Sequence, residues 1–421
     1  MRKQCRTYMK NLVRILAELP LIEEYSPLRN RRILFGLTAS SSIYRSIDLI
    51  RKLIRLGAEI KVVMTRESLS LITPDLVEWA IGSKPLIEFT GRAEHIELAN
   101  WAEAFIIAPA TLNTISRIAY GIADQLLHLT AITMMGAGKK LAILPTMNMK
   151  LYNSPQYREA INKLASYNNV SIINPLIEEG KAKFPPINDV VHCIDALVNR
   201  GRDLEGKYML ITAGPTIEYI DPVRIITNNS SGLMGVLLAR EAVCRGAVVD
   251  LVHGPLRVEP PYNVNKYPVT TTAQMAKTIS KLTNEKQYDA AIFAAAPSDY
   301  TVLSRSHKKI STHEHVSLVV RLKQTPKTIK YVSRSKKPKL LIIFSAETVD
   351  NHLELVEKAR NKLLEYNADL AIANNVSISG VGFSSNYIDA CIVSSDSHEC
   401  MGVIRKEVLA RKIIDIVKQN I

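Results

Sequence analysis

Short apolar runs alternate with amphipathic helical patterns along most of the chain. Residues 32–65 run from apolar RILFGL through polar TASSS and a helical pattern to a second apolar run, and residues 208–253 repeat this order. Apolar runs without polar alternation are typical of strands buried on both faces of a parallel sheet. We therefore predict a strand–loop–helix–strand unit in each half of the chain.

The remaining apolar runs extend both predicted sheets. They cover residues 104–110, 140–147, 170–175, 289–297, 339–347 and 369–375. Helical patterns separate them, which predicts an α/β protein with two doubly wound, mostly parallel-sheet domains. The domains are expected at residues 31–200 and 208–421, with a basic arm over 1–30 and the linker GRDLEGK over 201–207.

The composition and charge of the chain indicate which kinds of molecule the protein binds. The formal net charge is +14, but lysine and arginine are spread along the whole chain and no nucleic-acid-binding fold is recognisable, so no nucleic-acid partner is expected. A basic surface also suits an enzyme that handles acidic small molecules. No apolar run is long enough to span a membrane. The five cysteines form no CxxC pair, which predicts a cytoplasmic protein without disulfides or a structural zinc site.

The stretch TNNSSGLMG, residues 227–235, stands where a helix should begin. Asparagine and serine are ordinary N-cap residues. The preceding loop, residues 211–229, is however longer than most connections in compact domains, and such loops are usually functional. Small residues at a helix start also expose backbone N–H groups to an anion. The residues alone thus predict an anion or nucleotide site and leave its chemistry open.

Several motifs resemble those of one enzyme pair. The run AGPTIEYIDPVRIITNNSSGLMG (213–235), with AAAPSDY (294–300), FSAET (344–348) and IANNV (372–376), resembles phosphopantothenate–cysteine ligases. HIELANWAE (95–103), APATLNTISRIAYGIAD (108–124) and PTMNMKLY (145–152) resemble the FMN-dependent phosphopantothenoylcysteine decarboxylases. The chain from about residue 31 onward therefore resembles the bifunctional enzymes of coenzyme A biosynthesis, with a flavoprotein-like first domain and a Rossmann-like second domain.

The resemblance implies a ligase that joins 4'-phosphopantothenate to cysteine through an acyl-cytidylate, using CTP and Mg²⁺. Asn228 would hold the acyl group, and Lys309 would stabilise charge in the transition state. Asp299 would contact the nucleotide or the metal. The residues implied at the CTP site are Ala294, Ala295, Asp299, Lys309, Phe344, Lys358 and Lys362. The alternatives are a helix N-cap for Asn228, helix-surface ion pairs with Glu354 for Lys358 and Lys362, a turn cap for Asp299 and a core position for Phe344. Lys308 is the alternative to its neighbour Lys309.

For the decarboxylase, the resemblance implies FMN and two catalytic residues, His95 and Asn148. The residues implied at the FMN site are Thr38, Ser40, Thr65, Ala110 and Thr111. Ala39 stands where the family usually has glycine. A structural histidine and a helix cap are the alternatives for His95 and Asn148.

The proton donor of the family's mobile flap is missing. The flap segment reads EEGKAKFPP (178–186) and has no cysteine, and Cys193 lies within a helical pattern. We expect Lys183, with its pKa lowered by desolvation, or Lys181 or a water to replace it. The alternative is an active ligase fused to a flavoprotein that stops at the enethiol or only binds FMN. The resemblance also implies a homo-oligomer built from flavin-domain trimers and ligase-domain dimers.

Overall fold

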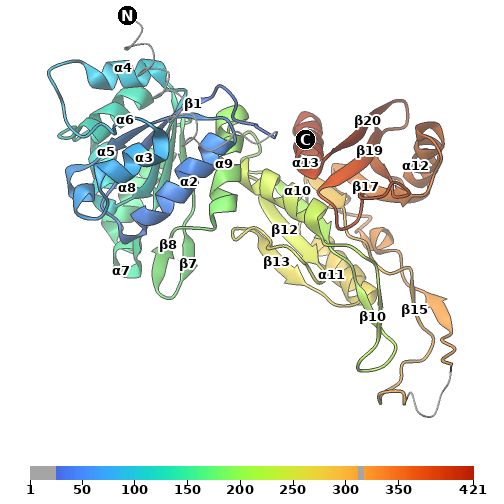
Figure 1. Cartoon of the computed structure of the whole chain (residues 1–421). Helices are drawn as coiled ribbons and strands as arrows, with labels where there is room; N and C mark the ends of the chain where they lie inside the picture. The colour runs from blue at the N-terminus through green and yellow to red at the C-terminus, as the bar shows by residue number, and fades with distance from the viewer. Residues whose placement is uncertain (1–24, 312–316) are drawn as a thin grey trace, which may run out of the picture. The chain divides into compact units, whose positions relative to one another are not determined.

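A computed structural model describes residues 25–311 and 317–421 of the chain. Cys5 and most of the predicted basic arm lie outside this part. The chain divides into two compact units, with the break between Arg202 and Asp203 (Figure 1). This break falls inside the segment predicted as a linker.

The first unit contains a five-stranded sheet. Its strands in sheet order are β2 (Glu59–Met64), β1 (Arg32–Leu37), β3 (Ala104–Ala110), β4 (Lys140–Pro145) and β6 (Val170–Ile172). All neighbouring pairs are parallel. Numbered by occurrence, this is the 2-1-3-4-5 order of flavodoxin-like folds, in which ligands bind at the switch point between the first and third strands.

Helices cover both faces of this sheet. One face packs against α2 (Tyr44–Arg55), α3 (Pro74–Ile81) and α9 (Ile187–Asn199). The other packs against α4 (Glu94–Trp101), α5 (Leu112–Tyr120), α6 (Leu126–Gly136) and α8 (Pro155–Ala165). Two short 3₁₀ helices, η1 (Ser41–Ile43) and η2 (Arg66–Ser70), follow β1 and β2. The unit is a three-layer α/β sandwich, as predicted.

A small antiparallel sheet lies beside this sandwich. It consists of β5 (Met147–Asn148), β8 (Lys181–Lys183) and β7 (Leu176–Glu178), and α7 (Met149–Tyr152) follows β5. Glu179 and Gly180 form the turn between β7 and β8 with φ values of 49° and 65°. The predicted flap is therefore a β-hairpin.

The second unit contains an eight-stranded sheet. Its strands in sheet order are β13 (Asn265–Pro268), β12 (Val248–His253), β9 (Tyr208–Ala213), β14 (Ala290–Phe293), β17 (Leu340–Glu347), β18 (Leu370–Asn375), β19 (Tyr387–Val393) and β20 (His398–Arg405). The first six are parallel and follow the 3-2-1-4-5-6 order of dinucleotide-binding folds. The last two are antiparallel. The predicted mostly parallel α/β class is confirmed, but β19 and β20 were not predicted.

Four long helices cover the second sheet. Those on one face are α10 (Leu233–Cys244) and α13 (Lys406–Asn420). Those on the other are α11 (Thr272–Glu285) and α12 (His352–Tyr366). A 3₁₀ helix, η3 (Thr328–Tyr331), contacts α11. No helix among the described residues is both long and apolar enough to cross a membrane.

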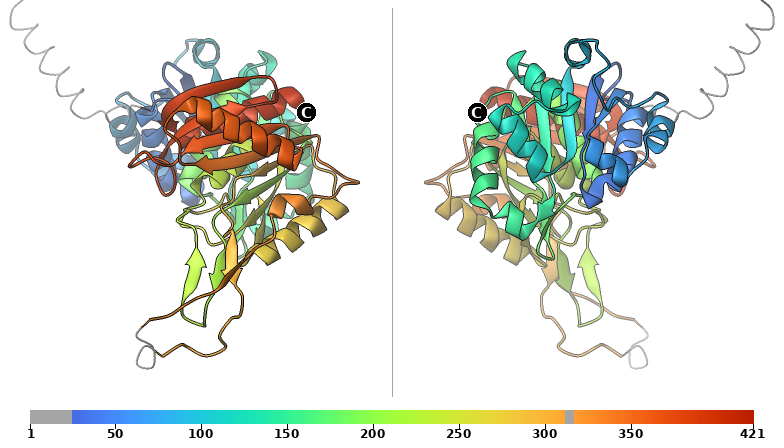
Figure 2. Two further views of the ribbon diagram at one scale, coloured as in Figure 1. Left: turned by 90° about the vertical axis from the view of Figure 1, so that its right-hand side faces the viewer. Right: turned by 90° about the vertical axis from the view of Figure 1, so that its left-hand side faces the viewer.

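Two hairpins extend from the sheet of this unit. They pair β10 (Ile217–Tyr219) with β11 (Ile225–Thr227) and β15 (Tyr300–Val302) with β16 (Leu322–Gln324). Figure 2 shows β10 and β11 in yellow-green and β15 in orange, projecting beyond the helices. The loop predicted over residues 211–229 is thus partly ordered as a hairpin.

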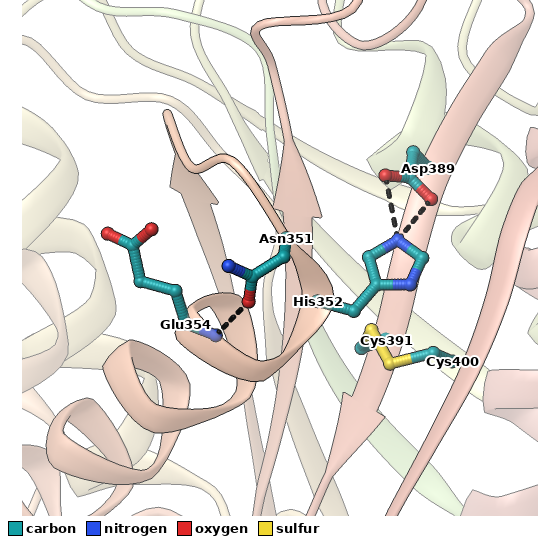
Figure 3. Close-up of a disulfide and its surroundings, with 6 residues drawn as sticks. All are labelled: Asn351, His352, Glu354, Asp389, Cys391 and Cys400. Atoms are coloured by element: carbon teal, nitrogen blue, oxygen red, sulfur yellow. Dashed lines mark hydrogen bonds and ion pairs between the residues drawn. A yellow bond between two sulfur atoms is a disulfide. The ribbon is translucent and has the colours of Figure 1, made fainter.

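The prediction that the cysteines form no disulfide is wrong. Cys391 on β19 and Cys400 on β20 are joined by a disulfide (Figure 3). The two residues lie directly opposite each other in the antiparallel register. Their spacing of nine residues gave no signal, because the pairing depends on two strands that the apolar pattern did not reveal.

Candidate active sites

The second unit has a cavity of about 570 Å³, within the range of small-molecule sites. It is formed where β14 and β17 end and α10 begins. The lining residues are 228–234, 293–299, 325–329, 343, 344, 346, 362, 366, 374, 382–384, 388 and 406. The cavity includes the β14 side of the switch point between β9 and β14, where ligands bind in such sheets. The stretch that resembles the ligase signature therefore forms one wall of a ligand-sized cavity.

The start of α10 is shaped by two glycines. Gly232, the N-cap, has φ of 80°, and no side chain caps the helix. At Gly235 a Cβ would lie 2.5 Å from Ala213 Cβ and 2.8 Å from the carbonyl oxygen of Thr212, so only glycine lets α10 pack this closely on β9. Leu233 N donates to Ser231 Oγ at 3.4 Å, but the N-cap glycine itself has no side chain to cap the helix, and this open start at the cavity suits an anion.

Asn228 does not cap a helix, since Gly232 is the N-cap of α10. Its amide nitrogen donates to the carbonyl oxygens of Ala296 at 3.2 Å and Pro297 at 2.9 Å. The side chain therefore joins the loop before α10 to the loop after β14. Among the described residues, no donor contacts its Oδ1.

Five of the seven predicted nucleotide residues line the cavity, namely Ala294, Ala295, Asp299, Phe344 and Lys362. The Asp299 carboxylate accepts from Lys327 Nζ at 2.8 Å, and Lys362 pairs with Glu347 at 2.5 Å. Lys358 does not line the cavity and pairs with Glu354 at 2.8 Å, which is the surface ion pair weighed as its alternative. Of the two predicted lysines of α12, only Lys362 lines the cavity, and Lys327 lines it as well.

Lys309 does not line the cavity of its own unit. It is exposed on the segment between β15 and β16, and its neighbour Ile310 is held at the β10–β11 hairpin. Ile310 N donates to Asp221 Oδ2 at 3.2 Å, and Arg224 donates to Ile310 O at 3.1 Å. Burial opposes ionisation of Asp221, but backbone and Arg224 hydrogen bonds outweigh it and hold the pKa of this carboxyl well below its usual range.

Lys406 was missed by the sequence reasoning. It lies in the cavity wall, is only 5% exposed, and donates to the carbonyl oxygen of Gly382 at 2.7 Å. Burial lowers the pKa of this lysine to about 8. Its position could have drawn attention to it, because Lys406 is the first residue of α13 and the helix dipole disfavours a cation there.

In the first unit, the predicted FMN residues gather at the carboxyl ends of β1, β2 and β3. The hydroxyl of Thr38 donates to the Pro109 carbonyl at 2.8 Å and accepts from Thr111 N at 3.2 Å. Ser40 Oγ lies 2.7 Å from Thr146 Oγ1. Thr65 follows β2, and Ala110 ends β3. This is the β1/β3 switch point of the flavodoxin-like order, and η1 begins there without a side-chain cap.

His95 and Asn148 lie on different elements of this unit. His95 is the second residue of α4, and its buried Nδ1 has no hydrogen-bond partner among the described residues. Asn148 caps α7 by accepting from Leu151 N at 3.0 Å, which was its alternative interpretation. It also pairs with Lys181 of β8, so the hairpin lies beside it. No hydrogen bond joins His95 to Asn148 in the described part of the chain.

The prediction that desolvation lowers the pKa of Lys183 is wrong for this structure. Lys183 Nζ pairs with Glu179 at 2.6 Å and Glu178 at 3.1 Å. Hydrogen bonds to these two carboxylates raise the pKa of Lys183 above its ordinary value. Cys193 lies in α9, as its helical pattern indicated.

Comparison with known proteins links each unit to a described family. The Flavoprotein family matches residues 21–199, and the DNA/pantothenate metabolism flavoprotein C-terminal domain matches residues 204–421. The coenzyme A biosynthesis bifunctional protein CoaBC of Methanocaldococcus jannaschii is 36% identical over 392 residues, covering 93% of this chain and 94% of the relative. That of Thermococcus kodakarensis is 36% identical over 396 residues, covering 93% and 96%.

A solved structure also matches the second unit. The crystal structure of the C-terminal domain of a coenzyme A biosynthesis bifunctional protein CoaBC is 32% identical. The match covers 52% of this chain and 97% of that one, with a TM-score of 0.42.

Proposed function

Because the chain belongs to the family of bifunctional coenzyme A biosynthesis proteins, we propose that its two units catalyse consecutive steps of that synthesis. The second unit ligates 4'-phosphopantothenate to cysteine through an acyl-cytidylate made from CTP. The first unit decarboxylates the product to 4'-phosphopantetheine with FMN. The observation that carries the ligase is the cavity in which Asn228 meets the start of α10.

The cavity of the second unit suits a nucleotide and a phosphorylated acid. The uncapped start of α10 offers backbone N–H groups to a phosphate. Lys327, Lys362 and Lys406 supply positive charge around the same space. Asp299 offers a carboxylate of the kind Mg²⁺ accepts together with phosphate oxygens and water. Asn228, already fixed by two carbonyl groups, would hold the acyl group while cysteine attacks.

Lys309 requires a second copy of the chain for the role that the resemblance implies. Its segment is anchored to the β10–β11 hairpin through Ile310, Asp221 and Arg224, so the lysine stays outside the cavity of its own unit. In a ligase-domain dimer this extended segment would bring Lys309 to the partner's cavity. A lysine there would stabilise the negative charge that develops during transfer to CTP.

The strand ends of the first unit fit a flavin phosphate. Thr38 joins the ends of β1 and β3 through Pro109 and Thr111, and Ser40 would offer its hydroxyl where η1 begins uncapped at the switch point. When bound, FMN supplies the electron sink that oxidative decarboxylation needs. Asn148 would hold the substrate carboxylate beside the β7–β8 hairpin. His95, with an unpartnered buried nitrogen, would complete the site in a flavin-domain trimer.

A flavoprotein that stops at the enethiol is the second candidate for the first unit. The observation that favours it is the double ion pair of Lys183, because a lysine with a raised pKa is a poor proton donor. We nevertheless propose complete reduction, since a decarboxylase fused to its ligase gains little from an oxidised product. Lys181 or a water would then deliver the proton.

Two assays test this function on the full chain. With CTP, Mg²⁺, 4'-phosphopantothenate and cysteine, we expect phosphopantothenoylcysteine, CMP and pyrophosphate. No CMP under any condition would refute the ligase. For the first unit, anaerobic turnover of phosphopantothenoylcysteine should give saturated 4'-phosphopantetheine by mass spectrometry. A product lighter by two hydrogens would support the second candidate, and Lys183→Ala should leave the saturated product unchanged.

A further inference from the structure

A histidine, an aspartate and the disulfide lie together at the antiparallel edge of the second sheet (Figure 3). One ligand atom each from His352, Cys391 and Cys400 can be chosen so that all three lie within 4.8 Å of one another. This set is separate from the residues that line the nucleotide cavity. Imidazole nitrogen and thiolate sulfur are the ligands that Zn²⁺ and related cations prefer.

The fold explains why these residues meet. Cys391 and Cys400 are direct partners in the β19–β20 register. Asp389 precedes Cys391 by two residues on β19, so both side chains point to the same face of the sheet. That face is covered by α12, whose first residue is His352. Three segments therefore bring one histidine and two cysteines to one point.

The histidine is oriented as metal-binding histidines are. His352 Nε2 lies 3.0 Å from both carboxylate oxygens of the buried Asp389. Figure 3 shows the other ring nitrogen on the side away from Asp389, where the sulfur atoms lie. A carboxylate that fixes one nitrogen of an imidazole while the other binds a metal is the usual outer partner of such ligands.

The site is open on one side. Cys391 is fully buried, whereas the His352 side chain is 42% exposed and Cys400 is partly exposed. A reductant or a cation can therefore approach from the side of His352 and Cys400. Water can fill a fourth coordination position there.

We propose that the Cys391–Cys400 disulfide is reversible, and that its reduced form binds a thiophilic divalent cation such as Zn²⁺ through Cys391, Cys400 and His352. A dithiol reductant supplies the two electrons: its thiolate attacks one sulfur, and its second thiol releases the protein and leaves a cyclic disulfide. Coordination of Zn²⁺ by both sulfurs then releases two thiol protons. A small-molecule disulfide can reoxidise the pair: it accepts the two electrons and leaves as two thiols, the Cys391–Cys400 disulfide forms again, and the cation is released.

The test uses Co²⁺ as a spectroscopic probe on the full chain. The protein is reduced with dithiothreitol, exchanged anaerobically into buffer, and titrated with Co²⁺. We expect one equivalent to bind with thiolate-to-cobalt charge-transfer absorption, and the oxidised protein to show none of it. A thiol assay before titration counts the reduced cysteines. A disulfide that stays closed in the folded protein under reductant overturns the proposal.

Matched variants separate this site from the other cysteines. The double variant Cys391→Ala/Cys400→Ala lacks both proposed sulfur ligands and keeps Cys5, Cys193 and Cys244. It should therefore lose the charge-transfer absorption, although the other cysteines are present. His352→Gln should weaken Co²⁺ binding strongly, Asp389→Asn by about 10- to 100-fold, and the exposed His398→Gln not at all. Equal Co²⁺ spectra of the reduced wild type and the double variant would overturn the proposal.

A measurement on the wild-type protein tests the site without variants, which could lose Co²⁺ binding simply because they misfold. In the reduced wild type, Zn²⁺ should abolish alkylation of Cys391 and Cys400 by iodoacetamide, as read by peptide mass spectrometry. Unchanged alkylation of both residues in saturating Zn²⁺ would show that no cation binds there.

Discussion

The two units use one structural plan, yet they present different candidate sites. In each, a helix begins without a side-chain cap after the first strand, whereas α11 of the second unit carries a complete capping box. After β9 the long loop and its hairpin leave a ligand-sized cavity. After β1 the loop is short, and Thr38, Ser40 and Thr111 bond to neighbouring strand ends. Loop length, rather than the sheet, distinguishes the two sites.

Two lysines show the same contrast. Lys406 in the wall of the cavity is buried, and its pKa falls to about 8. Lys183 on the β7–β8 hairpin pairs with two glutamates, and its pKa rises. The desolvated lysine that the sequence placed on the flap is thus found in the other unit. Burial lowers the pKa of a lysine and ion pairing raises it, and a short sequence motif reveals neither environment.

The largest effect should come from reciprocal asparagine variants. Asn228→Asp removes the donor to Ala296 and Pro297 and places a carboxylate against two carbonyl oxygens. We expect ligation to fall by about 10²–10³-fold, the range for losing one positioned donor, with decarboxylation unchanged. Asn148→Asp keeps the α7 cap, because aspartate caps as well as asparagine, and should impair only decarboxylation. Equal loss of both activities in either variant would contradict independent sites.

Lys406 gives the second unit a predicted pH dependence. Its folded pKa, about 8, lies below the ordinary value of 10.5, so the unfolded chain binds more protons between these values. The stability of the unit should therefore rise with pH across that window, by at most about 1.4 kcal/mol per pH unit. Lys406→Met should lose this rise, and Lys418→Met on the same helix should keep it. Denaturant unfolding at several pH values measures the slope.

Two helical glycines should respond differently to alanine. Gly235→Ala places a Cβ against Ala213 and the Thr212 carbonyl, and overpacking of this kind costs about 1–3 kcal/mol in the free energy of unfolding. Gly136→Ala, at the end of α6 in the first unit, meets no atom within 4 Å and should not destabilise. Urea unfolding measures the change in the free energy of unfolding for each variant. A destabilised Gly136→Ala beside an unchanged Gly235→Ala would refute the packing argument.

The smallest effect distinguishes two lysines on one helix. Lys362 lines the cavity and Lys358 does not, although both lie on α12. Lys362→Gln should raise the KM for CTP about tenfold, the lower range for a charged hydrogen bond. Lys358→Gln loses a surface pair worth about 0–1 kcal/mol in stability and should leave this KM unchanged. Steady-state kinetics at saturating 4'-phosphopantothenate and cysteine compare them.

Much of the sheet architecture could be predicted from the sequence, because its strands are buried on both faces. Both β1 and β3 begin and end where their apolar runs do. The edge strand β20 is largely exposed or half-buried, and β19 contains Asp389, so neither gave a continuous apolar run. The site residues on strand ends followed from the strands. Lys406 and the Cys391–Cys400–His352 group did not, because the two cysteines lie on β19 and β20 and Lys406 follows β20, and neither strand was predicted.

The place of α13 determines when the second unit can mature during translation. This helix, the last described element, buries Leu409, Ile413 and Val417 in the core beneath α10, and Lys207 near the start of the unit bonds the carbonyl of Ile421. The nascent unit therefore keeps an apolar face uncovered until residue 421 leaves the ribosome. The first unit has all its strands by residue 183 and can fold while the second is still being synthesised. A chain cut short before α13 would thus contain a complete first unit and a second unit whose apolar face is uncovered.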